Sequence, residues 1–412
     1  MPIPRRIPRV HAVFVALVLA CGSATERSGI QMTDSAGVRI ATISTQPQAL
    51  AEWSSDSTPL LTLAEPDSAG FTMVSAVHTM SDGRLLVADL RRAGLYLYDA
   101  RGQLLRAFGR QGNGPGEFRG LMTVSASGDS VGTWDLSMRR FSLFSAARGF
   151  ERILPTPPTP GDYETPREAW LGPGQTVVTY WLRTTNPGPV PQGVRIRRWQ
   201  STADLTLSDS TGRITGRTPT FNGSYSGQSD RGDARQLFSN LPFVAVGADR
   251  VAFGSGEQLD VYIADAGLRV TNIVRWRGAD EVLSEAEVER GRAALRSNLP
   301  PGAPAERVEE ALRTIVAPEL LPKQRPAVSR ALWDDAGQLW LGRFEAPVRG
   351  IAEASEWYVL DTSLRPQARL RMPSNVRLEA VRGDDLVVSV KDSLDVQSVQ
   401  LRRLHRSTPG RR

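Results

Sequence analysis

Short segments that alternate hydrophobic and polar residues recur along the chain and predict β-strands. Residues 82–108 read as a turn, an aliphatic strand, a strand that alternates Leu with Tyr, a second turn and a third strand. The pattern then returns, so that Asp89 corresponds to Asp135 and Tyr98 to Phe144, each pair separated by 46 residues. Two independent markers with one offset indicate an internal repeat.

The repeat continues to the end of the chain and predicts six units. The second strand of each unit ends at Asp89, Asp135, Tyr180, Ser255, Arg343 and Ser389, at intervals of 46, 45, 75, 88 and 46 residues. The two long intervals predict insertions. Thr184–Gln236 is rich in Gly, Pro, Ser and Thr and is expected to form long strands with a mobile loop, whereas Ala279–Pro318 has the apolar spacing of two short amphipathic helices. Six such units predict an all-β fold, a six-bladed β-propeller with a short helical insertion between blades four and five.

The last repeat, Val376–Leu404, ends after its third strand. The alternating segment Gly37–Ile43 is predicted to supply the missing fourth strand, because joining the two chain ends in one blade removes two open sheet edges. The propeller is therefore expected to span residues 37–404, after a linker over 21–36 and before a basic tail over 405–412.

The first twenty residues have the pattern of an export signal. Arg5, Arg6 and Arg9 precede the apolar run Ala12–Ala20. Nine apolar residues extend about 14 Å as a helix, roughly half of the ~30 Å hydrocarbon core of a bilayer. The pattern predicts a signal peptide over residues 1–20 and not a membrane-spanning helix.

The leader ends in Val18-Leu19-Ala20-Cys21, which resembles a bacterial lipobox. The resemblance implies cleavage before Cys21 and lipid attachment to its thiol, and Gly22 after it implies an outer-membrane destination, facing the periplasm or the cell surface. The alternative is ordinary cleavage near Ala24, which discards Cys21. Because Cys21 is the only cysteine, the mature body has no disulfide and depends on core burial and sheet closure.

A glycine-rich segment, Phe108–Phe118 (FGRQGNGPGEF), joins the first two repeats, and Arg140–Phe144 (RFSLF) follows Asp135 in the second. These motifs resemble the NHL-repeat type of six-bladed propeller, which carries a Gly-Pro-Gly turn, an aspartate at a strand end and an arginine that starts the next strand. The match is strong over about residues 71–154, although Gly94 replaces the arginine in the first repeat. The resemblance implies the fold and says little about activity.

Composition and charge exclude several classes of protein. A hydrophobic fraction of 40% and a charged fraction of 23% are those of an ordinary globular chain. The net charge is +6, and removal of the three leader arginines leaves +3. Acidic residues and arginines are interspersed almost everywhere except in the tail from Arg402 to Arg412, and no basic stripe is long enough for a nucleic-acid groove, so we expect no nucleic-acid partner. The expected partners are the membrane, through the lipid anchor, and an envelope protein or a small ligand.

Few residues could carry out catalysis. Gly109–Gly116 lacks the Lys-Ser/Thr ending of a phosphate loop and is predicted to be a turn. His78 lies in an apolar strand and is predicted to be structural, and His405 lies in the tail, so a zinc site or a Ser-His-Asp triad has no recognisable basis. Carboxylates alone could bind calcium at the axis of a propeller, as in lactonase-like enzymes. The candidates are Asp82, Asp89, Asp135, Asp334 and Asp335.

Three functions remain open at this point. The first is a cell-envelope lipoprotein whose propeller binds a protein or a small ligand. The second is a metal-dependent, lactonase-like hydrolase or a lyase with a metal held by carboxylates, and the third is a structural envelope protein. The scarcity of histidine and cysteine favours binding over catalysis, and we expect no cofactor. The sequence predicts no ligand-binding residue.

Overall fold

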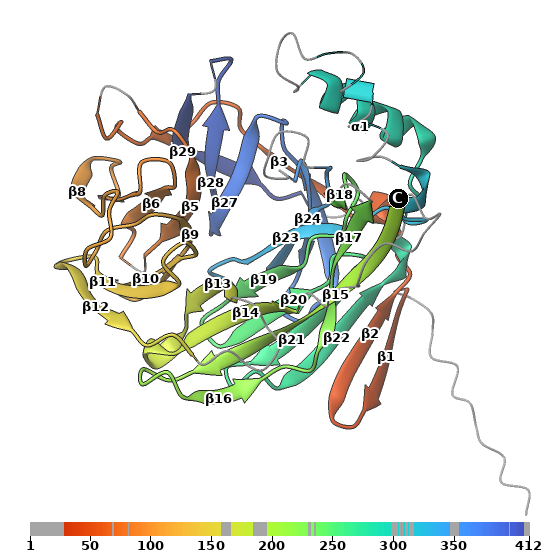
Figure 1. The fold of residues 1–412 in the computed structure, drawn as a ribbon, viewed down its shortest axis with the longest axis horizontal. Helices are drawn as coiled ribbons and strands as arrows, with labels where there is room; N and C mark the ends of the chain where they lie inside the picture. The colour runs from red at the N-terminus through yellow and green to blue at the C-terminus, as the bar shows by residue number, and fades with distance from the viewer. Residues whose placement is uncertain are drawn as a thin grey trace, which may run out of the picture.

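The computed structural model describes residues 29–407, except for 68–69, 81, 158–165, 184–195, 230–231, 235, 280, 298–303, 305, 307, 310–311, 313–316, 347–353 and 395. The predicted signal peptide and Cys21 lie outside the described residues. The described strands form five hydrogen-bonded sheets, the largest of which contains two blades, and they follow one another around a central axis (Figure 1). The predicted all-β, six-bladed propeller is confirmed.

The first two blades are regular, four-stranded antiparallel sheets. Their strands are β5 (Val74–Thr79), β6 (Leu85–Asp89), β7 (Gly94–Tyr98), β8 (Leu104–Phe108), β9 (Leu121–Ser127), β10 (Ser130–Asp135), β11 (Arg140–Ser145) and β12 (Gly149–Leu154). Every residue of β6 is buried, because the neighbouring blades cover both of its faces. This double burial is the reason that the second strand of the repeat is so apolar in sequence.

The third blade carries the first insertion. Its elements are β13 (Pro166–Leu171), η2 (Pro173–Gln175), β14 (Val177–Arg183), β15 (Ile196–Ser208), β16 (Ile214–Arg217), β17 (Phe221–Ser229) and β18 (Gly232–Ala234). The 13-residue strand β15 pairs with β14 through its second half and with β17 through its first half. The long strands predicted between Thr184 and Gln236 are therefore present, and the loop over 184–195 lies outside the described residues.

The remaining three blades contain the helical insertion. Their elements are β19 (Phe243–Val246), β20 (Arg250–Gly254), β21 (Asp260–Asp265), β22 (Val270–Trp276), η3 (Arg277–Ala279), α1 (Glu285–Ser297), η4 (Pro318–Leu320), β23 (Val328–Trp333), β24 (Leu339–Arg343), β25 (Glu356–Leu360), β26 (Pro366–Arg371), β27 (Val376–Arg382), β28 (Asp385–Lys391) and β29 (Gln397–His405). Helix α1 lies in the chain between β22, the last strand of blade four, and β23, the first of blade five. The second predicted helix falls largely on residues outside those described.

The predicted closure by Gly37–Ile43 is wrong. Strand β2 (Val38–Ile43), with β1 (Ile30–Ser35) outside it, pairs in parallel with β22 and extends blade four (Figure 1). Ile43 is buried there in one cluster with Trp276, so the apolar side of β2 has a core to join at that edge. Alternation identified a strand correctly, but it contained no information about which sheet edge the strand would occupy.

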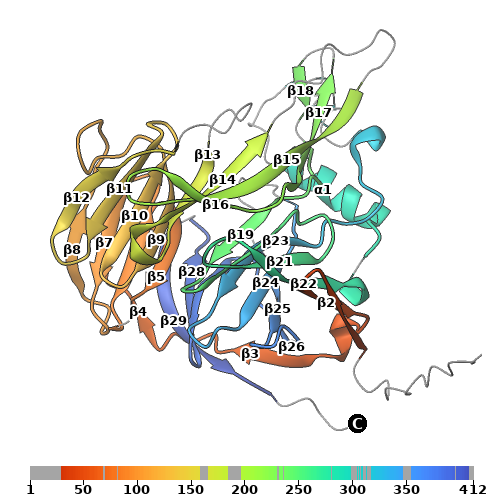
Figure 2. The same cartoon turned by 90° about the horizontal axis from the view of Figure 1, so that it is seen from below.

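Two later segments close the ring instead. The two-residue strand β4 (Leu61–Thr62) pairs with β29 and is the fourth strand of blade six. Before it, after η1 (Pro47–Ala49), β3 (Ala51–Ser55) pairs in parallel with β26 of blade five and then reaches β29 through Ser54 and Ser55. Figure 2 shows β3 running along the outside between these two blades. The N-terminal segment thus contacts blades four, five and six before blade one begins.

Candidate functional site

The repeat aspartate of the first blade fastens two turns. Asp89 is fully buried at the end of β6, and its carboxylate accepts hydrogen bonds from the backbone N–H groups of Thr72 (2.6 Å), Met73 (3.2 Å) and Arg92 (3.1 Å). These bonds join the segment that enters β5 to the turn that leaves β6. Asp89 therefore has a structural role.

Asp135 repeats this geometry in the second blade. Its carboxylate accepts from the N–H groups of Arg119 (2.7 Å), Gly120 (3.0 Å) and Met138 (2.8 Å). Two identical arrangements, 46 residues apart, explain why an aspartate marks the repeat. The equivalent positions of the other blades hold Tyr180, Ser255, Arg343 and Ser389, so this fastening is confined to blades one and two.

The other three candidate aspartates also bind protein groups, Asp82 at one turn and the neighbours Asp334 and Asp335 at another. Asp82 pairs with Arg84 (2.6 Å), Asp334 accepts from the Trp340 indole N–H (3.0 Å), and Asp335 accepts from a backbone N–H in the next blade. Within the described residues, no three side chains of the metal-binding types gather in one place. The five aspartates therefore do not converge on an axial site.

A different carboxylate lies among the innermost strands. The side chain of Glu379 on β27 is fully buried and forms ion pairs with Arg330 of blade five (2.9 Å) and with Arg377 (3.4 Å). Arg377 in turn donates to the carbonyl oxygens of Val74 (3.2 Å) and Ser75 (3.0 Å) in blade one. One buried carboxylate and two arginines thus link blades five, six and one.

His78 extends these links to the second blade. Its Nε2 lies 2.6 Å from the carbonyl oxygen of Val124 on β9, so Nε2 carries the proton and donates. Burial lowers the pKa of His78, and this effect outweighs the opposing influence of the hydrogen bond and of Glu379. The structure places this histidine in a satisfied, neutral, structural role, as the sequence predicts.

Glu168 on β13 is the most perturbed carboxyl of the innermost strands. Burial raises its pKa to about 7, and no charged neighbour opposes the shift. Tyr180 lies beside it on β14, and burial likewise raises the pKa of the Tyr180 hydroxyl. The carboxyl of Glu168 therefore changes charge near neutral pH, which makes it a candidate functional group.

The replacement Glu168→Gln is expected to remove a pH dependence of stability. The unfolded carboxyl ionises near 4.5 and the folded one near 7, so the folded state binds more protons between these values. Stability should fall as pH rises through this window and stay level above it, by about 1–2 kcal/mol because the side chain keeps some contact with water. Urea unfolding at pH 4.5 and pH 8 measures the change. If the free energy of unfolding falls by the same amount between these pH values in the variant and in the wild type, the assignment is contradicted.

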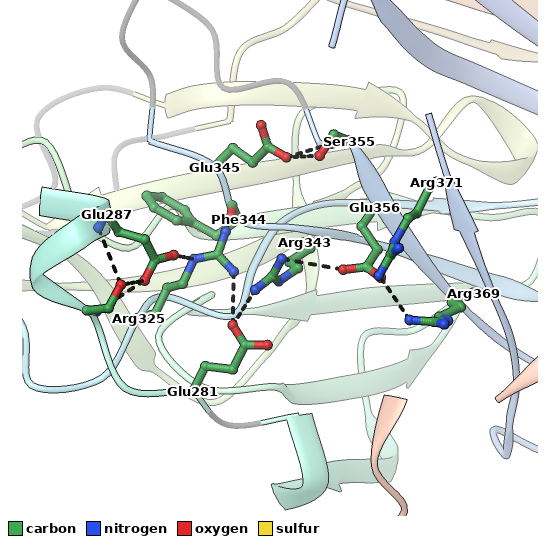
Figure 3. A network of polar contacts seen from close by, with 11 residues as sticks. Glu281, Glu287, Arg325, Arg343, Phe344, Glu345, Ser355, Glu356, Arg369 and Arg371 are labelled. Carbon is green, nitrogen blue, oxygen red and sulfur yellow. Dashed lines mark hydrogen bonds and ion pairs between the residues drawn. The ribbon is translucent and has the colours of Figure 1, made fainter. Parts of the chain in front are cut away.

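An extended ion-pair network anchors the helical insertion to blade five (Figure 3). Arg325, just before β23, pairs with Glu287 of α1 (3.1 Å) and with Glu281 (3.2 Å). Glu281 also pairs with Arg343, at the end of β24. Although burial alone would raise the pKa of Glu287, hydrogen bonds from Ser284 and the charge of Arg325 hold it below its usual value.

The network continues across blade five to its outer strand. Glu356, at the start of β25, lies 3.4 Å from Arg343, 3.8 Å from Arg369 and 3.4 Å from Arg371 (Figure 3). Three arginines thus share one carboxylate, and Arg369 has a second partner in Glu52 of β3 (3.0 Å). Ion pairs therefore link the helical insertion to blade five and blade five to strand β3.

The two insertions, which are separate in sequence, contact each other. Strand β15 packs against η4, and Leu237 and Phe238 share a hydrophobic cluster with Val288 of α1 and Phe344. A Cβ at position 291 would lie 2.4 Å from Leu237 Cδ2, so glycine permits this close approach. We call this unit, residues 196–229, 237–238, 285–297 and 318–320, the insertion wall. Figure 2 shows β15 and β17 extending past the other strands with α1 beside them.

The sequence did not identify the residues of this network. Only Arg343 carried a signal, because it replaces the aspartate of the repeat. Trp181, near the first insertion, is fully buried and donates to Thr206 Oγ1 (2.8 Å), whereas Trp170 and Trp199 are half-buried. Among the residues that the structure describes, no helix combines the length and apolar character needed to cross a bilayer.

Comparison with known proteins agrees with this architecture. A family model described as "6-bladed beta-propeller" matches residues 56–128, which include blade one. The chain is a six-bladed β-propeller. The matching family is not described as an NHL-repeat family, so the resemblance to NHL repeats stays a prediction. No curated protein matches the chain.

Solved propeller-like structures are similar at low identity. A Bacteroides fragilis protein described as exported is 10% identical, with 87% of this chain and 99% of that one covered and a TM-score of 0.45. A member of the DUF4221 family from Bacteroides vulgatus is 10% identical over 87% and 100%, with a TM-score of 0.48. An aldose sugar dehydrogenase from Streptomyces coelicolor is 12% identical over 84% and 98%, with a TM-score of 0.42. Such low identities say nothing about the activity of this propeller.

Proposed function

We propose that this propeller is an exported, lipid-anchored binding protein of the cell envelope, whose ligand contacts the face that carries the insertion wall. The observation that supports this most directly is the contact between the two insertions. Binding residues concentrate on loops that a rigid scaffold positions. A wall fixed by ion pairs and a shared apolar cluster loses little freedom on binding, which favours affinity.

The proposed anchor would keep this face near the membrane. Nine positions separate Cys21 from Ile30, the first residue of β1. At the limit of about 3.5 Å per residue, they span at most about 30 Å. An anchored propeller would therefore meet partners at the membrane surface.

The geometry favours binding over the metal-dependent hydrolase. The five candidate aspartates are hydrogen-bonded or ion-paired at four turns, and Glu379 of the innermost strands pairs with both Arg330 and Arg377. A structural envelope protein would make no specific contact at the insertion wall. The experiment below distinguishes this alternative from a binding protein.

The test is site-specific photocrosslinking in intact cells. A photoreactive residue at Glu289, exposed on α1, should give a discrete adduct. The matched control is the exposed Arg101, in the turn between β7 and β8 at the opposite end of the blades, which should give none. Equal labelling at both positions, or none at Glu289, would favour a structural protein.

In the same cells Cys21→Ser should release the protein from the membrane fraction; a variant that stays membrane-bound with an unchanged mass would exclude the anchor.

A further inference from the structure

A groove of about 420 Å³ lies where β3 passes between β26 of blade five and β29 of blade six, and no residue of the insertion wall lines it. It is lined by the segment from Glu52 to Ser57, by Arg371 and Pro373, and by Arg402 of β29. Its volume is within the range of small-molecule sites. Neither the repeat pattern nor the family match draws attention to it, because it exists only where β3 crosses from one blade to the next.

Arg402 is the unusual residue of this groove. It is only 7% exposed, and its guanidinium donates twice to one neutral acceptor, Gln400 Oε1, from Nε (3.1 Å) and from Nη2 (2.9 Å). No acidic residue in the described part of the chain pairs with it. Burial accordingly lowers the pKa of Arg402, with no opposing charge to restore it.

The other charged groups of the groove are already paired. Glu52 pairs with Arg369 (3.0 Å), and Asp56 lies within hydrogen-bond distance of His405 Nε2 (2.7 Å), a contact that is an ion pair only when the imidazole is protonated. Arg371 shares Glu356 with two other arginines and is 62% exposed, so its free side faces solvent. Arg402 is therefore the buried charge of the groove, and no ion pair in the described part of the chain balances it.

A buried charge without a partner is costly, because the groups around it do not replace its lost hydration. An arginine fork matches the two oxygens of a carboxylate or phosphate, which can accept two parallel hydrogen bonds. The hydroxyl groups of Ser54 and Ser57 are exposed at the rim and could donate to the same ligand.

We propose that this groove binds a small anionic ligand that presents a carboxylate or phosphate group to Arg402, with Arg371 at the entrance. The site is independent of the insertion wall. A variant that abolishes binding in the groove should leave crosslinking at the insertion wall unchanged, so either proposal can be contradicted without affecting the other.

The test measures the binding of two defined probes to the purified mature protein by calorimetry and by the shift in melting temperature. The probes are inorganic phosphate and glucuronate, compared with sodium chloride at equal ionic strength and with neutral glucose. Binding of one probe identifies the oxyanion class, and binding of both indicates a general oxyanion site. If neither probe binds or raises the melting temperature above its control, the proposal is overturned.

Variants assign the effect to the groove. Arg402→Gln is expected to weaken probe binding by about tenfold or more, the equivalent of one charge-assisted hydrogen bond. The matched control is Arg403→Gln on the same strand, where the arginine is exposed and pairs with Asp385 (3.2 Å); its binding should equal that of the wild type. If Arg402→Gln fails to fold, Arg371→Gln at the exposed entrance should still lower affinity about threefold. Unchanged binding in the Arg402 variant, or in the Arg371 variant should that one be needed, would overturn the proposal.

Discussion

Asp89→Ala is expected to lower the free energy of unfolding by about 3–4 kcal/mol, one of the two largest effects in this propeller. The substitution leaves three backbone N–H groups, those of Thr72, Met73 and Arg92, without their acceptor in a buried position. Hydrogen bonds to a charged group contribute about 1.5–3 kcal/mol each and are not additive within one carboxylate. Urea unfolding at pH 7 measures the loss.

The control for this prediction is Asp99→Ala in the same blade. Asp99 accepts from the N–H groups of Arg101 (2.9 Å) and Gln103 (2.8 Å), but its turn is exposed, so water replaces the lost acceptor. We expect a loss of about 1 kcal/mol there. Asp135→Ala should behave as Asp89→Ala does. Similar losses for Asp89→Ala and Asp99→Ala would contradict the fastening role.

Trp53→Ala is expected to cost about 4 kcal/mol, because it removes the largest side chain of the closing strand. Trp53 is buried in β3, its ring centroid lies 5.8 Å from that of Trp340, and Arg406 stacks over it at 4.7 Å. The indole N–H also donates to the carbonyl oxygen of Ser407 (3.3 Å). Since β3 joins blades five and six, the midpoint of the whole unfolding transition should fall, without a separate early transition.

Trp53→Phe separates packing from hydrogen bonding. It keeps an aromatic ring against Trp340 and loses the bond to Ser407, so we expect a loss of about 1–2 kcal/mol. Equal losses for the alanine and phenylalanine variants would show that the ring contact contributes nothing. A separate early transition in Trp53→Ala would show that β3 is a peripheral strand and not part of the closure.

The sequence predicted the parts of this fold that repeat locally. A turn, a doubly buried strand and an aspartate at its end recur at fixed spacing, because each blade must cover its neighbours and fasten its own turns. The closure was mispredicted for a physical reason. Strand β4, the fourth strand of blade six, has two residues, too few to alternate, whereas β2 alternates well but joins blade four.

The polar sites could not be predicted, because their partners are distant in the chain. Arg325 and Glu281 are 44 residues apart, and Arg343 and Glu281 are 62 apart. No periodicity reports such a pair. The burial of Arg402 also has no local signature in the sequence. The arginines around it suggest an exposed basic tail, and Arg402 becomes enclosed only because β3 passes from blade five to blade six beside it.

The path of the N-terminal segment also determines the order in which the chain can fold. Residues 30–62 precede blade one in the chain, yet their partners β22, β26 and β29 extend as far as His405. Strand β2 lacks its blade partner until residue 276 has been made, β3 until residue 371 and β4 until residue 405, and such long-range pairing slows folding. Blades one to three can assemble from contiguous segments in the meantime. The ring is therefore completed by a segment that precedes blade one, and a chain that stops before β29 would remain open, with strand edges available for aggregation.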